Sequence, residues 1–172
     1  MIRAQTFRPG ARMIELIGDG GHAAVIRDLI AVCDRLNKNI CLDGTIIAVG
    51  NNRHRQREVL NRGNISYATL IHHSATVAAS ADIGPGTVIM AGAVVQARAK
   101  IGAHCILNTC CSVDHDCVVD DFVHVAPGAH LCGTVKVGKG AMVGTGVCVA
   151  QNATLTPWTL YKSRRLDPCP MP

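Results

Sequence analysis

The chain is 172 residues long, which is enough to bury a hydrophobic core as one domain or two small ones. Hydrophobic residues make up 48% of it and aromatic residues only 3%, so its core must consist of small and branched aliphatic side chains. The net charge of +5 comes without an obvious lysine- and arginine-lined face or stacking aromatic residues, which argues against a nucleic-acid-binding protein.

Residues 1–12 are basic but lack the apolar segment of a secretory signal, and we treat them as an N-terminal extension. No apolar run approaches the length needed to span a membrane. Nine cysteines occur without any C-x-x-C pair, and Cys105, Cys111 and Cys117 are six residues apart. This spacing is typical of small hydrophobic residues in a reducing compartment, so we expect a cytoplasmic protein without disulfides or structural zinc.

Residues 13–70 are predicted to form a small α/β unit. Its elements, in chain order, are a strand at 13–17, a helix at about 21–33, a strand at 45–52, a helix at 53–61 and a short strand near 66–71. The turn "GDGGHA" (18–23) fits G-x-G-x-x-A between a strand and a helix, where free helix N–H groups can bind a phosphate. A tight turn that needs glycine only for its backbone is the alternative.

A six-residue period runs through residues 71–160. Every sixth residue from Ile71 to Leu155 is Ile, Val or Leu, and the residue four positions after each is Ala, Cys, Thr or Val. This pattern is typical of a parallel β-helix in which each hexapeptide forms one face of a triangular prism. We predict a left-handed β-helix of five coils, about 24 Å long at ~4.8 Å per coil, with the hand taken from known hexapeptide prisms. The aliphatic residue should lie inside and the small residue at the corner. Residues 161–172 should form an irregular tail.

The stretch "SVDHDCVVDDFVHVAPG" (112–128) places His115 and His124 among four aspartates. The two histidines lie two and five residues after the aliphatic position of their hexads, so neither is expected to be a core histidine. They are candidates for acid–base chemistry because histidine titrates near neutrality. A role at the solvent-exposed surface or at a subunit interface is the alternative.

Three stretches, "LIGDGGHAAVIRDL", "IIAVGNNRHRQ" and "NTCCSVDHDCVVDDFVHVAPGAHLCG", resemble the bacterial sugar acetyltransferases that act on sialic acid or on UDP-4-amino sugars. The resemblance covers roughly residues 13–155, and 108–133 is its most specific part. It implies a homotrimer in which a Rossmann-like sugar-nucleotide domain precedes a left-handed β-helix. It also implies that acetyl-CoA lies between neighbouring β-helices and passes its acetyl group directly to an amine or hydroxyl, with no metal.

The resemblance also implies roles for single residues. His115 corresponds to the general base, with Asp116 holding its ring, although Asp114 on the other side is an alternative partner. His124 corresponds to the histidine near the thioester carbonyl, and Asn108 is expected beside it in the cofactor groove. A base of this kind takes the proton of the attacking N–H or O–H during acyl transfer.

Gly133 corresponds to the glycine whose N–H faces the developing oxyanion and contacts the cofactor, an interaction that can contribute ~3–4 kcal/mol. The sugar nucleotide would meet Gly18, Gly20, Gly21 and His22. The chain departs from the family here, because only eleven residues separate the first helix from the next strand and Asp43 is the only remaining acid that could hold the nucleotide sugar. The irregular tail also replaces a further coil.

Two other functions fit a hexapeptide prism. A trimeric scaffold that has lost its acceptor site, and with it catalysis, would explain the shortened N-terminal unit and the tail. A γ-type carbonic anhydrase needs a histidine pair five residues apart and a third about two coils earlier. The spacings found here, from 115 to 124 and from 124 to 130, do not match that pattern.

Overall fold

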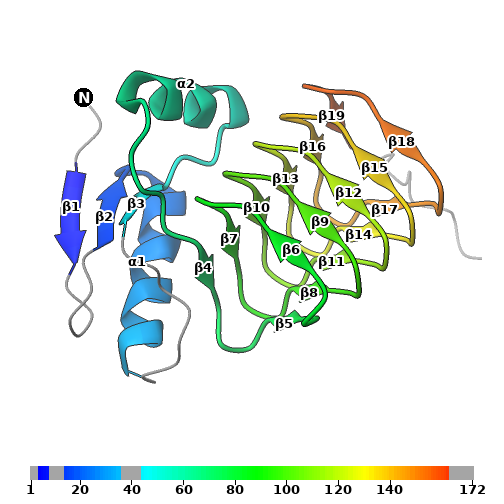
Figure 1. The fold of residues 1–172 in the computed structure, drawn as a ribbon, viewed down its shortest axis with the longest axis horizontal. Coiled ribbons are helices and arrows are strands. Elements are labelled where there is room, and N and C mark those ends of the chain that lie inside the picture. Colours follow the sequence, from blue (N-terminus) through cyan, green and yellow to red (C-terminus); the bar gives the residue numbers. More distant parts are fainter. Residues whose placement is uncertain (1–3, 8–13, 36–43, 163–172) are drawn as a thin grey trace, which may run out of the picture.

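The structure is a computed structural model that describes residues 4–7, 14–35 and 44–162. A small α/β unit lies beside the first coils of a long parallel β-helix (Figure 1). Within the described ranges, neither helix is long and apolar enough to cross a membrane.

The α/β unit is a β-α-β arrangement followed by a second helix. β2 (Ile14–Ile17) and β3 (Gly44–Ile47) pair in parallel, α1 (Gly21–Arg35) connects them, and α2 (Asn52–Arg62) follows β3. α1 forms because its apolar residues recur at helical spacing and bury one face. Those fully buried are Ala23, Ile26, Leu29 and Ile30.

Part of the predicted N-terminal extension is a strand. β1 (Ala4–Phe7) pairs antiparallel with β2, which gives the sheet order β1-β2-β3. The pairing covers an edge of β2 that would otherwise be open to association. The short strand expected near 66–71 is also divided, because Tyr67 makes only an isolated bridge to Thr45 while Leu70–Ile71 belongs to the β-helix.

The β-helix is the predicted left-handed parallel prism of about five coils, built from two-residue strands in three sheets. Each strand pairs with the strand 18 residues later, as Val113 does with Leu131. We call the six-stranded sheet the docking face: β4 (Leu70–Ile71), β7 (Val88–Ile89), β10 (Ile106–Leu107), β13 (His124–Val125), β16 (Met142–Val143) and β19 (Leu160–Tyr161). The second sheet is β5 (Thr76–Val77), β8 (Val94–Val95), β11 (Ser112–Val113), β14 (His130–Leu131) and β17 (Cys148–Val149). The third is β6 (Asp82–Ile83), β9 (Lys100–Ile101), β12 (Val118–Val119), β15 (Lys136–Val137) and β18 (Thr154–Leu155).

The small residue of each hexad lies inside the prism and not at its corner, which corrects the prediction. Cys105, Cys111 and Cys117 are buried in the same core as the aliphatic residues, and burial raises the pKa of Cys105 and Cys111 to about 12. The corner is formed by the two residues before the small one. The second of these has a φ of +55° to +72° at every sixth residue from Gly86 to Trp158. The left-handed backbone makes the turn, and the narrow interior just beyond it admits only a small side chain.

The hexads also continue further than predicted. β19 pairs in parallel with β16, and Tyr161 packs against the prism core at the position that aliphatic residues occupy elsewhere. Its hydroxyl accepts a hydrogen bond from the Thr156 N–H at 2.7 Å. The sequence pattern missed this strand because an aromatic residue stands at the aliphatic position.

A second core joins the α/β unit to the docking face. Outward-facing side chains of the first three docking-face strands and Met90 pack against β2, β3 and α1. The outward residues Leu70, Val88 and Ile106 are spaced by 18, one coil each, and all are buried. This packing fixes the α/β unit on one face of the prism.

Helix α2 ties this unit to one corner of the β-helix. Arg55, only 1% exposed, donates to the carbonyls of His104 and Phe122, each at 2.8 Å, and to the Asn52 side chain at 2.8 Å. Asn52 in turn donates to the carbonyl of Gly140 at 3.1 Å. His104, Phe122 and Gly140 stand at equivalent corners of three successive coils, so the hydrogen bonds of α2 connect three coils. Burial lowers the pKa of Arg55 to about 10, which leaves it charged at neutral pH.

Candidate active site

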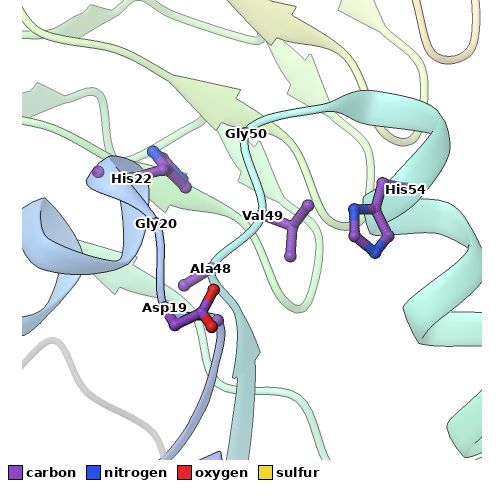
Figure 2. Close-up of a pocket in the computed structure, with 9 residues that line it drawn as sticks. Asp19, Gly20, His22, Ala48, Val49, Gly50 and His54 are labelled. Carbon is purple, nitrogen blue, oxygen red and sulfur yellow. The ribbon is translucent and has the colours of Figure 1, made fainter. Parts of the chain in front are cut away.

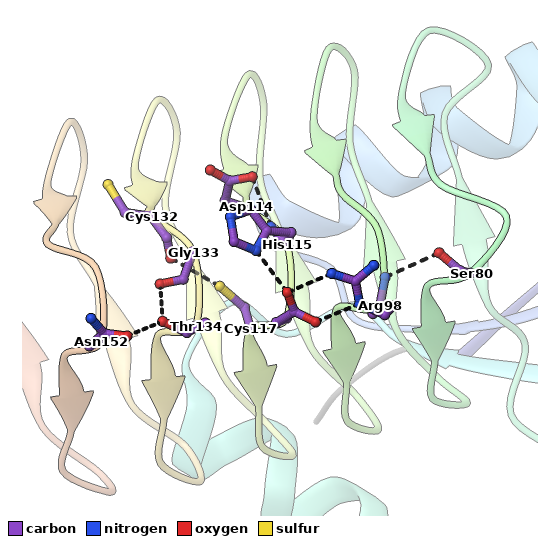
Figure 3. Close-up of polar contacts among 10 residues, drawn as sticks. Ser80, Arg98, Asp114, His115, Cys117, Cys132, Gly133, Thr134 and Asn152 are labelled. Atoms are coloured by element: carbon purple, nitrogen blue, oxygen red, sulfur yellow. Dashed lines mark hydrogen bonds and ion pairs between the residues drawn. The ribbon is translucent and has the colours of Figure 1, made fainter.

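His115 stands at the corner between β11 and β12, with its side chain 46% exposed (Figure 3). Its Nδ1 lies 2.8 Å from Oδ2 of Asp116, while Oδ1 of Asp114 accepts the backbone N–H of His115 at 2.8 Å. Asp116 therefore contacts the ring, and Asp114 holds only the backbone. Because a carboxylate is an acceptor, Nδ1 carries the proton and Nε2 is left as the basic atom.

Arg98 adds a partner that the sequence analysis did not identify. Its Nε and Nη2 donate to Oδ1 and Oδ2 of Asp116 at 2.7 and 2.8 Å. The hydrogen bonds from Arg98 and from His115 hold the pKa of Asp116 well below its usual value. The signal was present in the sequence, because Arg98 precedes Asp116 by 18 residues and equivalent corners of adjacent coils are only ~4.8 Å apart.

Gly133 follows His115 by one coil and lies against its ring. A Cβ at this position would approach Cε1 and Nε2 of His115 to 2.6 Å, so a larger residue would displace the ring. The backbone of Gly133 does not have a positive φ, so glycine is needed here for space and not for conformation. Its N–H has no hydrogen-bond acceptor within the described part of the chain.

Asn108 and His124 form a separate cluster on the docking face. Oδ1 of Asn108 accepts the Thr109 N–H at 2.8 Å, which turns Nδ2 of Asn108 toward Nε2 of His124 at 3.1 Å. Nε2 of His124 is therefore the acceptor, and its proton sits on Nδ1. His124 is outside the prism interior, as expected, yet it is buried under the α/β unit. Burial, then Arg55, then His22 lower the pKa of His124 to about 4, while the backbone of Gly50 acts in the opposite direction.

Within one chain the two clusters are not together. His115, Asp116 and Gly133 lie at the corner between the second and third sheets, whereas Asn108 and His124 lie on the docking face. The nine residues from His115 to His124 are one and a half hexads, which carries the chain from a corner past β12 and onto the next sheet. The resemblance implies a cofactor groove between neighbouring β-helices, so the separation of the two clusters within one chain does not contradict it.

The residues of the predicted glycine turn line a pocket of about 360 Å³ between α1 and α2 (Figure 2). Gly18, Gly20, Gly21 and His22 form one side, and the other residues are Asp19, Ala48, Val49, Gly50 and His54. Burial, then Arg55, lower the pKa of His22 to about 4, so its ring is neutral at neutral pH. Asp43 lies outside the described residues.

The glycines of this turn differ in what they need. A Cβ at Gly18 would meet the carbonyl oxygen of Ala48 at 2.5 Å, and its φ is +146°, so Gly18 is required by the turn itself. At Gly20 and Gly21 a Cβ would meet nothing within 4 Å. The tight-turn interpretation therefore accounts for Gly18 only. The backbone at Gly20 and Gly21 is uncovered and lines the pocket.

His54 is a pocket residue that the sequence analysis missed. It stands in the first turn of α2, and its Nε2 lies 3.3 Å from Oε1 of Glu58. The available signal was topological, because the segments that follow two parallel strands meet at the carboxyl edge of their sheet. "GDGGH" follows β2 and "AVGNNRH" follows β3.

Among the described residues, no three His, Cys, Asp or Glu side chains come together in a group that could hold a metal ion. No protein-family model matches the chain, and no curated protein sequence matches it.

Solved structures do match the chain, and they place it in the class of left-handed β-helix acetyltransferases. The acetyltransferase domain of PglB from Neisseria gonorrhoeae is 35% identical with a TM-score of 0.77, over 84% of this chain and 85% of that one. The same domain has been solved in complex with acetyl coenzyme A. PerB from Caulobacter crescentus, solved with CoA and GDP-perosamine, is 30% identical with a TM-score of 0.76, over 86% of this chain and 84% of that one. The chain belongs to this family of hexapeptide-repeat sugar N-acetyltransferases.

Proposed function

We propose that the protein transfers the acetyl group of acetyl-CoA to the amine of a nucleotide-linked sugar, with His115 as the general base. The observation that carries this proposal is the His115 ring held by Asp116 against Gly133 at an exposed corner. The chemistry of the relatives supports it, since one is solved with acetyl coenzyme A and another with CoA and a sugar nucleotide that bears an amine.

In the proposed reaction the sugar amine attacks the thioester carbonyl carbon of acetyl-CoA. The N–C bond forms while Nε2 of His115 takes the amine proton, which Asp116 favours by stabilising the positive ring. The free N–H of Gly133 stabilises the oxygen of the tetrahedral intermediate. The C–S bond then breaks, and the CoA thiolate takes the proton from His115. Asn108 and His124 contact the cofactor in this scheme.

The pocket at the glycine turn is proposed to hold the sugar nucleotide. Open N–H groups at the start of α1 suit a phosphate, and α1 has no acidic residue in its first turn, although the carboxylate of Asp19 also lines the pocket. His22 and His54 offer ring nitrogens from opposite sides of the pocket.

We further propose a homotrimer, because the two clusters of one chain lie on different parts of the prism and a neighbouring chain can bring one to the other. Long charged side chains are rare on the prism, which has only four basic residues between 71 and 160. Sedimentation equilibrium should give three times the mass of the chain at micromolar concentration. A monomer under these conditions would contradict the shared site.

The activity is tested by following CoA release with a panel of acceptors. Saturable turnover is expected with UDP- or GDP-linked amino sugars and not with the free amino sugar, and the matching nucleoside diphosphate should inhibit competitively. Turnover with the hydroxyl of free sialic acid instead would indicate O-acetylation. No turnover with any acceptor would favour the non-catalytic scaffold.

A further inference from the structure

We propose that Arg98 is a positioning residue for the His115 base: it holds the Asp116 carboxylate in the orientation that accepts the Nδ1–H of His115. The inference rests on the proposed function, and its test below includes a measurement that does not depend on turnover.

The geometry of the carboxylate is the first argument. Arg98 donates to both oxygens of Asp116, and Oδ2 also lies 2.8 Å from Nδ1 of His115. A guanidinium bonded through two nitrogens fixes the plane of a carboxylate as well as its position, which a lysine ammonium cannot do. The direction of Oδ2 toward the histidine ring is thus set from the adjacent coil.

The exposure of this corner is the second argument. The side chains of His115, Asp116 and Arg98 are 46%, 35% and 66% exposed, so packing does not hold them. The ring of His115 contacts Asp116 on one side and Gly133 on another. Without Arg98, the Asp116 carboxylate would keep His115 as its only side-chain partner among the described residues, and the pair would be free to rotate together.

The backbone of the corner makes the arrangement possible. Arg98 and Asp116 have φ values of +60° and +59° and are equivalent positions of adjacent coils. The Asp116 N–H donates to the Ala97 carbonyl at 3.1 Å, and the Arg98 N–H donates to Ser80 Oγ at 3.2 Å. The chain of contacts Ser80, Arg98, Asp116, His115 runs along this corner over three coils (Figure 3).

The test compares Arg98→Gln, Arg98→Lys and the control Lys139→Gln. Lys139 also bridges adjacent coils, with its Nζ 3.5 Å from Oδ2 of Asp121, but it does not contact His115. We expect Arg98→Gln to lower kcat by about 10- to 100-fold through misplacement of the base, with KM for acetyl-CoA little changed. Arg98→Lys keeps the charge but not the contact through two nitrogens, so it should restore only part of kcat, and Lys139→Gln should leave kcat unchanged.

The independent readout is the ¹⁵N chemical shifts of the His115 ring, which report the nitrogen that carries the proton. In the wild type the proton should sit on Nδ1, and in Arg98→Gln the Nε2–H tautomer should become populated. If the protein transfers no acetyl group to any acceptor, this shift still decides the role of Arg98. Wild-type ring shifts and an unchanged kcat in Arg98→Gln, or an equal loss of kcat in Lys139→Gln, would overturn the inference.

Discussion

Replacing His115 with alanine should lower kcat by about 10²–10⁴-fold, the usual cost of removing a positioned base. The fold should tolerate the change, because the side chain stands at an exposed corner outside the aliphatic core. Only the bond to Asp116 and the contact with Gly133 are lost, so the thermal midpoint and acetyl-CoA binding should stay close to wild type. The measurements are steady-state kinetics with a confirmed acceptor and calorimetric binding of acetyl-CoA.

His130→Ala is a matched control for this variant. His130 is also an exposed histidine of the prism with a side-chain partner on the adjacent coil, since its Nδ1 lies 2.8 Å from Ser112 Oγ. Its loss should leave kcat unchanged. A His115→Ala protein with wild-type kcat would mean that another group, or an amine that is already deprotonated, removes the need for this base. His124→Ala is a poorer probe, because that side chain is buried and its removal also disturbs the docking face.

The six-residue period predicted the prism because a narrow triangular interior admits one kind of side chain at each repeat. A search for apolar residues at a period of 18 would also have predicted which face of the prism the α/β unit covers. Leu70, Val88 and Ile106 are outward-facing apolar residues one coil apart, which marks the face that the α/β unit covers. The antiparallel pairing of β1 was not predictable, because four residues of mixed polarity give no strand signal.

For the site, the family resemblance grouped His115, Asp116 and Gly133, and the 18-residue coil explains why they meet. The same spacing connects Arg98 to Asp116, but one basic residue among the hexads resembles an ordinary solvated side chain until the coil register is considered. Arg55 was beyond sequence reasoning altogether. It lies in "NRHRQREVLNR", a polar helix in which nothing separates the buried arginine from its exposed neighbours.

Replacing the buried Arg55 should have a large effect on stability. Arg55→Met keeps an unbranched apolar stem but removes the guanidinium and its five hydrogen bonds, to four backbone carbonyls and to Asn52. The carbonyls of His104 and Phe122 would be left buried without these donors. We expect the free energy of unfolding to fall by about 3–5 kcal/mol, because each unsatisfied buried group costs 1–3 kcal/mol. Urea unfolding measures the loss, with Arg57→Met as the control, since Arg57 is an exposed residue of the same helix.

The pH dependence of stability checks the same interface independently. The pKa values of His22, His104 and His124 are each lowered to about 4 in the folded protein. Burial is the largest cause for all three rings, and the positive charge of Arg55 is the second. In the unfolded chain these rings titrate near their ordinary value of about 6.5, so between these pH values protons bind the unfolded chain preferentially. Stability should therefore be fully present above pH of about 6.5 and fall progressively as the pH is lowered toward 4.

Hydrogen exchange locates the effect of Arg55→Met. Faster exchange is expected in α2 and β3, whose contacts with the prism depend on Arg55, while the amides of β11 and β14 keep their protection because the prism core is intact. Uniformly faster exchange would mean that α2 stabilises the whole prism and not only the docking of the α/β unit. If Arg55→Met lowers the free energy of unfolding no more than Arg57→Met does, the hydrogen bonds of Arg55 to the corners of the β-helix contribute little to stability. The α/β unit would then be held mainly by the apolar packing of Leu70, Val88, Met90 and Ile106.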